Sequence, residues 1–114
     1  MNYKQSDIVL VNVIFSEGSG VKKRPALIIS DEYYHNNRQE VIIAAITSNT
    51  ERVLPGDKKI KDWQQAGLKF PSIVTGIIQT LKTDIIERKI GELANTDFVG
   101  FQNNLKKVLG FSKK

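Results

Sequence analysis

Glu40-Val-Ile-Ile-Ala-Ala-Ile46 is the most apolar segment in the middle of the chain, and it runs directly into Thr47-Ser-Asn-Thr50. A run that is almost entirely apolar and rich in β-branched residues is typical of a strand with both faces covered. The polar cluster that follows marks the end of that strand. We therefore expect residues 40–46 to form a central strand of a sheet, with a neighbouring strand on each side.

Two further strands are expected before the central one. Asp7–Phe15 is rich in β-branched residues and is followed by the flexible loop Glu17-Gly-Ser-Gly20. A second strand over Ala26–Ser30 is expected to start after Pro25, because proline fits the beginning of a strand better than its interior. The polar, asparagine-rich residues Asp31–Gln39 predict a connecting segment.

The residues after the central strand predict shorter elements. We expect an edge strand over Lys58–Lys61 and a short helical turn over Trp63–Ala66. Residues 71–81 predict one bent strand or two strands with a bulge at Gly76, and a further strand is expected over Ile86–Ile90. Apolar residues then recur at helical spacing, namely Phe98, Phe101, Leu105, Val108 and Leu109. Thr96 is the expected N-cap of this helix, and Gly110 is expected to close it.

Length and composition predict one domain over residues 1–114. A chain of 114 residues is too short for two cores of ordinary size, and its 40% hydrophobic and 25% charged residues are typical of a globular protein. Five or six short strands followed by one helix predict a mainly β fold, a small curled barrel with the C-terminal helix packed against it. A domain of this size often gains apolar surface by pairing with a copy of itself.

Composition also restricts the function. The chain has no cysteine and one histidine, so disulfides, thiolate metal sites and histidine-built zinc sites are excluded, and we expect no metal or cofactor. The net charge of +5 favours an anionic partner such as nucleic acid, although a merely solvated basic surface explains the charge equally well. No run approaches the roughly 18 apolar residues of a membrane span, so we expect a cytoplasmic protein without membrane contact.

Two short segments contain residue types suited to phosphate chemistry. Gly18-Ser-Gly-Val-Lys-Lys-Arg-Pro25 places three cations after a glycine loop, and the planar guanidinium of Arg24 can hold two phosphate oxygens at once. A hairpin whose lysines and arginine prevent edge-to-edge pairing would look the same. Thr47 and Ser48 end a buried strand, where hydroxyls can donate to a phosphate or simply bond the local backbone.

An ordered set of motifs resembles the MazF/PemK family, the ribonuclease toxins of type II toxin–antitoxin systems. The motifs cover roughly residues 6–110: Asp7-Ile-Val-Leu-Val11, Lys23-Arg-Pro-Ala-Leu-Ile-Ile-Ser30, Ala44-Ala-Ile-Thr-Ser48, Gly67-Leu-Lys-Phe-Pro-Ser-Ile-Val74 and Arg88-Lys-Ile-Gly-Glu-Leu93. The resemblance implies an SH3-like barrel that forms a homodimer and cuts single-stranded RNA without a metal, through attack by a ribose 2′-hydroxyl. It also implies a cognate antitoxin that binds in or near the RNA groove.

The resemblance further implies roles for individual residues. Arg24 and Thr47 match the family's catalytic positions, and residues expected to contact RNA are Ser19, Lys22, Lys23, Ser48, Gln79 and Lys82. Because a guanidinium rarely loses its proton, we assign Arg24 mainly to electrostatic stabilisation. The general base stays open: Glu17 lies in the glycine loop, but Ser19 falls nearer the position where some members carry an acid.

One strand departs from the family pattern. Many members have an arginine and a nearby acid where this chain has Gln79 and Lys82, which puts one phosphate contact in doubt. A non-catalytic module of the same fold that binds nucleic acid or a peptide is therefore the alternative hypothesis, and a purely structural dimerisation domain is a third.

The aromatic residues and the single histidine have simpler interpretations. We expect Phe15, Phe70, Phe98 and Phe101 in the core, and Trp63 over a mouth of the barrel. Tyr33 and Tyr34 either stack on unpaired bases or are ordinary surface residues. His35 is expected at the surface, and a contact with RNA is the alternative interpretation.

Overall fold

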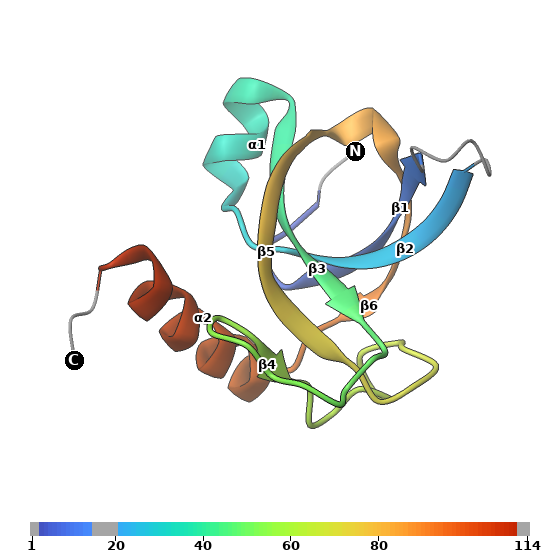
Figure 1. Cartoon of the computed structure of the whole chain (residues 1–114). Coiled ribbons are helices and arrows are strands. Elements are labelled where there is room, and N and C mark those ends of the chain that lie inside the picture. Colours follow the sequence, from blue (N-terminus) through green and yellow to red (C-terminus); the bar gives the residue numbers. More distant parts are fainter. Residues whose placement is uncertain (1–2, 15–20, 112–114) are drawn as a thin grey trace.

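A computed structural model describes residues 3–14 and 21–111 of the chain. Figure 1 shows a strongly curved sheet, with a short helix at the upper left of the view and the C-terminal helix at the lower left. The elements, in chain order, are β1 (Asp7–Ile14), β2 (Val21–Ile28), α1 (Glu32–Arg38), β3 (Glu40–Thr47), β4 (Lys58–Lys59), β5 (Ile73–Lys82), the 3-10 helix η1 (Thr83–Ile85), β6 (Ile86–Glu92) and α2 (Asn95–Leu109).

The six strands in the described part of the chain form one antiparallel sheet with the order β4-β5-β3-β2-β1-β6. The prediction of a central strand is confirmed, because β3 lies between β5 and β2. The mainly β fold with a C-terminal helix is also confirmed (Figure 1). The sheet curls but does not close, since β4 and β6 form its two edges and β4 is only two residues long.

The central strand is apolar because it contributes to two separate hydrophobic clusters. Ala44 and Ile46 belong to a first cluster, which also contains Phe98 and Phe101 of α2. The alternate residues Val41 and Ile43 belong to a second cluster. Successive side chains of a strand point to opposite faces, so a strand covered on both faces needs an unbroken apolar run.

β5 is one continuous strand with an irregularity where the bulge was predicted. Its pairing with β3 shifts register between Ala44 and Ile46, and Thr75 Oγ1 donates a hydrogen bond of 2.7 Å to Ala45 O at this point. A Cβ on Gly76 would lie 3.0 Å from Pro55 O, so glycine allows the preceding turn to pack closely against the bulge.

The prediction that a strand starts after Pro25 is wrong. Pro25 lies inside β2, where it pairs with Leu10 of β1. On its other side, the ladder between β2 and β3 ends at the pair Ala26–Ala45. Proline is tolerated at this position because it lies outside the β2–β3 ladder, so β3 needs no backbone hydrogen bond from it.

The expected connecting segment between β2 and β3 is also wrong, since residues 32–38 form α1. Asp31 caps its first turn by accepting from the Tyr33 N–H, and Gln39 closes it in the left-handed conformation. His35 is half-buried instead of at the surface, and its ring nitrogens lie 2.6 Å from Ser30 Oγ and 3.1 Å from Tyr3 O. These tertiary contacts stabilise a short helix that its own asparagine-rich sequence does not favour.

The last helix, α2, ends as predicted at Gly110, which has a φ of +80° and donates to the carbonyls of the final turn. The predicted N-cap is wrong: Thr96 lies inside the helix, and Ala94 precedes it without a side-chain cap. In the described part of the chain, no helix is long and apolar enough to cross a membrane.

Asp97 of α2 joins the helix to the segment after β4. Its side chain is 2% exposed, and its two carboxylate oxygens accept from the backbone N–H groups of Lys61 and Asp62 at 3.1 and 3.0 Å. Lys58 Nζ lies 3.6 Å from the same carboxylate. A buried acceptor of two backbone donors is costly to remove because both donors lose their partner.

We expect Asp97→Ala to lower the free energy of unfolding by about 2 kcal/mol or more, for that reason. Urea denaturation followed by circular dichroism measures this change. Asp84→Ala, at an exposed position on η1, is the matched control and should change stability by less than about 0.5 kcal/mol. Equal stabilities of the two variants would contradict a structural role for Asp97.

Candidate functional site

A cleft of about 680 Å³ lies where β2 begins its pairing with β1 and where β3 ends. Its walls come from β1, β2, the end of β3, the segment before β5, and β6. The lining residues are Leu10, Lys23, Arg24, Pro25, Ile46, Thr47, Ser48, Gly67, Leu68, Lys69, Phe70, Ser72, Arg88 and Ile90.

Arg24 and Thr47, which the sequence analysis singled out separately, line this same cleft. The ladder between β2 and β3 pairs Ala26 with Ala45. Continuing that antiparallel register past Pro25 sets Arg24 opposite Thr47, and directly opposed residues direct their side chains to the same face. The strand pairing therefore brings together a guanidinium and a hydroxyl that are far apart in the sequence.

The described lining of the cleft is basic. Four of its lining residues are basic, Lys23, Arg24, Lys69 and Arg88, and no described lining residue is acidic. Lys23 Nζ forms an ion pair of 2.8 Å with Glu87, which is outside the lining. Among the described residues, neither Lys69 nor Arg88 has a carboxylate within ion-pair distance. Such a concentration of charge attracts an anion.

Thr47 is positioned by a local hydrogen bond that still leaves it able to donate. Its Oγ1 accepts from the Asn49 N–H at 3.1 Å, and Asn49 Oδ1 accepts in turn from the Glu51 N–H at 3.2 Å. The first bond uses a lone pair of the hydroxyl oxygen, and the hydroxyl hydrogen remains a donor. Local backbone bonding and a role in the cleft are therefore compatible at Thr47. Ser48, the next residue, is exposed and lines the same cleft.

The segment before β5 reaches the cleft because two glycines let it pack against β6. Gly67 has a φ of +90°, and a Cβ there would lie 2.3 Å from Ile90 O. A Cβ on Gly91 would lie 2.0 Å from Ala66 O. Side chains at either position would push the two backbones apart. Lys69 and Phe70, which follow Gly67, and Arg88 of β6 line the same cleft.

Lys69, Phe70 and Arg88 line the cleft but were not predicted as site residues, although all three lie within motifs shared with the family. Phe70 was expected in the core, which is wrong: it is 62% exposed and lines the cleft. Its position between Lys69 and Pro71 was the available signal, since a phenylalanine flanked by a lysine and a proline lacks the alternation of a half-buried strand.

Other predicted RNA-contacting residues lie elsewhere. Ser19 and the candidate base Glu17 are outside the described residues, as is Phe15. Lys22 is exposed on β2 without lining the cleft. On β5, Thr47 pairs with Ile73, whereas Gln79 and Lys82 pair with Ile43 and Glu40 toward the opposite end of the strand. The structure therefore does not bring Gln79 and Lys82 to Arg24 and Thr47.

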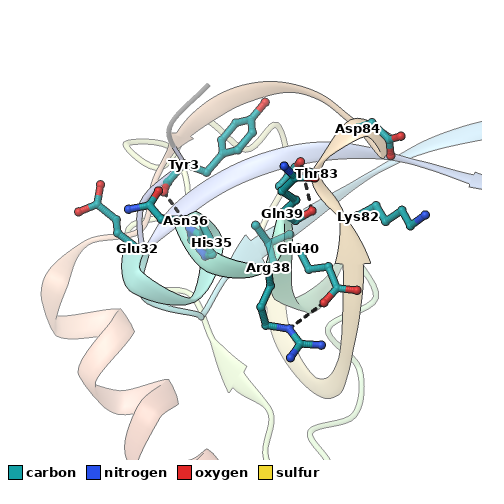
Figure 2. A pocket seen from close by; sticks show the side chains of 11 residues that line it. Tyr3, Glu32, His35, Asn36, Arg38, Gln39, Glu40, Lys82, Thr83 and Asp84 are labelled. Carbon is teal, nitrogen blue, oxygen red and sulfur yellow. Dashed lines mark hydrogen bonds and ion pairs between the residues drawn. The ribbon is translucent and has the colours of Figure 1, made fainter.

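Lys82 lines a second cleft, of about 510 Å³, between α1 and η1 (Figure 2). This cleft has three carboxylates against two cations, namely Glu32, Glu40 and Asp84 against Arg38 and Lys82. Arg38 Nε donates to Glu40 Oε1 at 2.9 Å, and this hydrogen bond raises the pKa of Arg38. The charges of this cleft partly neutralise one another. It therefore attracts anions less than the first cleft does.

The two tyrosines considered for base stacking lie on α1. Tyr33 is 71% exposed, and the Arg38 guanidinium lies 5.3 Å from the centre of the Tyr34 ring. Neither residue lines the first cleft. Trp63 packs against the first hydrophobic cluster. No group of three or more potential metal-ligating His, Cys, Asp or Glu side chains occurs among the residues that the structure describes.

The chain matches a known protein family, and its structure is similar to solved structures. A family model described as PemK-like, MazF-like toxin of type II toxin–antitoxin system matches residues 4–109. The structure is similar to that of a MazE–MazF complex (Form-III) from Deinococcus radiodurans, with a TM-score of 0.80 and 17% identity, covering 98% of this chain and 100% of that one. It is also similar to the Mycobacterium tuberculosis toxin MazF-mt6, with a TM-score of 0.74 and 24% identity over 91% and 96% of the two chains.

A third similar structure is an endoribonuclease in complex with its cognate antitoxin from a mycobacterial species. It has a TM-score of 0.77 and 19% identity, and the match covers 96% of this chain and 97% of that one. At these identities the three structures establish a common fold. Among curated protein sequences, none is significantly similar to this chain.

Proposed function

This chain belongs to the PemK-like, MazF-like toxin family of type II toxin–antitoxin systems, and from that premise we propose that it is an endoribonuclease that cuts single-stranded RNA without a metal. The observation that carries the proposal is the first cleft, where Arg24 and Thr47 share a wall and no described lining residue is acidic. A basic surface of this kind binds a polyanionic strand through its phosphates.

The proposed reaction is an internal transfer at phosphorus. The 2′-oxygen of a ribose bonds to the adjacent phosphorus, its proton is removed, and the bond to the 5′-oxygen breaks. The products are a 2′,3′-cyclic phosphate and a 5′-hydroxyl, whose oxygen takes up a proton. Negative charge grows on the non-bridging oxygens during the step, and donors already in position lower the energy of that state.

Arg24 and Thr47 are the proposed donors. The guanidinium of Arg24 presents two parallel N–H groups, which match two phosphate oxygens and remain charged throughout. The Thr47 hydroxyl accepts a hydrogen bond from the Asn49 N–H and donates its own hydrogen bond to the same phosphate. Lys23, Lys69, Arg88 and Ser48 lie along the cleft and are proposed to hold the neighbouring phosphates and sugars.

The departures at Gln79 and Lys82 do not weaken this proposal. Neither residue lines the first cleft, so their identities do not alter the surroundings of Arg24 and Thr47. The alternative of a non-catalytic module rested on these two departures, and both lie away from Arg24 and Thr47.

We also propose the partners and setting that family membership implies. A cognate antitoxin would inhibit the protein by covering the cleft, whose basic lining attracts acidic side chains. The protein would act as a single-domain homodimer, and exposed apolar side chains on α2, Val99, Val108 and Leu109, support self-association. The absence of cysteine suits the reducing cytoplasm.

We expect the purified protein to cut an unstructured RNA equally well in buffer containing EDTA and in buffer containing magnesium, because Arg24 and Thr47 supply the charge stabilisation. End-group analysis should find cyclic phosphates and 5′-hydroxyls. Salt-dependent RNA binding without these products would support the non-catalytic alternative instead. Cleavage that is lost in EDTA and restored by magnesium would contradict the metal-free mechanism.

A further inference from the structure

We infer that Phe70 stacks on an unpaired base of the bound strand and so gives the first cleft a base-binding position beside its phosphate-binding one. This inference deepens the proposed function and rests on RNA being the ligand. It assigns to Phe70 the contact that the sequence analysis considered for Tyr33 and Tyr34.

The exposure of Phe70 is the first observation. Phe70 is 62% exposed at a position that lines the cleft, together with Arg24, Thr47 and Arg88. An exposed phenylalanine lacks the favourable free energy of apolar burial, and its side chain has no polar group that hydrogen-bonds to water. A ring at the wall of a basic cleft regains that burial when a flat, apolar face covers it.

The backbone around Phe70 is held on three sides, which is the second observation. The Phe70 carbonyl accepts from Ser72 Oγ at 2.8 Å, and the Ser72 carbonyl accepts from the Ile60 N–H at 3.0 Å. Pro71 restricts the backbone between them. On the other side, Gly67 fixes the segment against Ile90 of β6. A platform that is already ordered loses little conformational entropy when a ligand binds.

The charges around the ring are the third observation. Lys69 is its direct neighbour in the chain, and Arg24 and Arg88 lie in the same cleft, with no described acidic residue in the lining. A single strand presents phosphates and unpaired bases side by side along its length. A basic groove that also contains an aromatic ring is the combination by which proteins bind such strands, with the cations on the backbone and the ring on a base.

The test measures binding separately from cleavage. The probes are fluorescein-labelled 2′-O-methyl oligonucleotides of about 12 nucleotides, one for each of the four bases, which lack the attacking hydroxyl and cannot be cut. A fully abasic oligonucleotide of the same length retains the phosphates and has no base to stack. Fluorescence anisotropy gives Kd for the wild-type protein and for Phe70→Ala, Phe70→Tyr and Tyr33→Ala.

We expect Phe70→Ala to weaken binding of at least one base-containing probe about ten- to fiftyfold and to leave binding of the abasic probe unchanged. Phe70→Tyr keeps the ring and should bind like the wild type. Tyr33→Ala removes an equally exposed ring outside the cleft, and it should also bind like the wild type. Phe70→Ala should unfold at the wild-type temperature, because the ring contributes little to the core.

Three results would overturn the inference. The first is binding of every base-containing probe by Phe70→Ala within about twofold of the wild type. The second is an equal loss on the abasic probe, which would show a general effect on the cleft. The third is a loss confined to Tyr33→Ala. Because the probes cannot be cut, a wild-type protein that binds them through Phe70 but leaves RNA intact refutes only the proposed catalysis.

Discussion

Arg24→Ala will lower kcat/KM for cleavage of an unstructured RNA about a thousandfold, because it removes the donor pair that stabilises charge on the phosphate oxygens. Arg24 is exposed on β2, so the substitution leaves no cavity in either hydrophobic cluster. The thermal unfolding temperature should therefore remain near that of the wild type. Initial rates of fluorogenic oligonucleotide cleavage give the first quantity, and circular dichroism gives the second.

Two companion variants separate the possible causes of that loss. Arg24→Lys keeps the charge but not the planar fork, and we expect it to recover only part of the activity. Arg52→Ala removes an exposed cation that does not line the cleft, and it should cut at the wild-type rate. Near-normal cleavage by Arg24→Ala would refute the assignment, and an equal loss in Arg52→Ala would show that overall charge is what matters.

Thr47→Val will lower kcat about a hundredfold with a smaller change in KM, because the hydroxyl donates to a charge that develops only during the reaction. Valine has nearly the shape of threonine and favours strands, so β3 should keep its register. Single-turnover cleavage at saturating protein measures the chemical step directly.

Thr47→Ser retains a hydroxyl and should retain most of the activity. Thr80→Val is the matched control, since Thr80 is exposed on β5 and does not line the cleft. The Asn49 N–H loses its acceptor in Thr47→Val, and a fall in unfolding temperature would reveal any disturbance of the turn. A valine variant that folds normally and cuts at the wild-type rate would remove Thr47 from the mechanism.

Much of the fold could be predicted because short-range signals agree with the tertiary structure. The apolar run before Thr47 indicated a strand covered on both faces, and the two clusters that share β3 explain why. Gly110 marked the end of α2, where its positive φ is required. At these positions the local preference of the residue and the needs of the core coincide.

The wrong predictions concern positions where contacts with other segments determine the local secondary structure. The helix α1 is held by the bonds of His35 to Ser30 and Tyr3, which residues 31–39 alone do not indicate. Pro25 is tolerated within β2 because the ladder with β3 stops beside it. In both cases the decisive partner belongs to another element of the sheet or to the N-terminal segment.

Composition, periodicity and side-chain type belong to the chain itself, and they were enough to predict a small, basic, mainly β fold and to single out Arg24 and Thr47 as candidates. The three-dimensional arrangement was needed to place these two residues in one cleft, with Lys69, Phe70 and Arg88 in the same lining. The physical reason is that strand register and close glycine contacts bring these residues together. Both depend on pairs of segments, and neither is encoded in one segment alone.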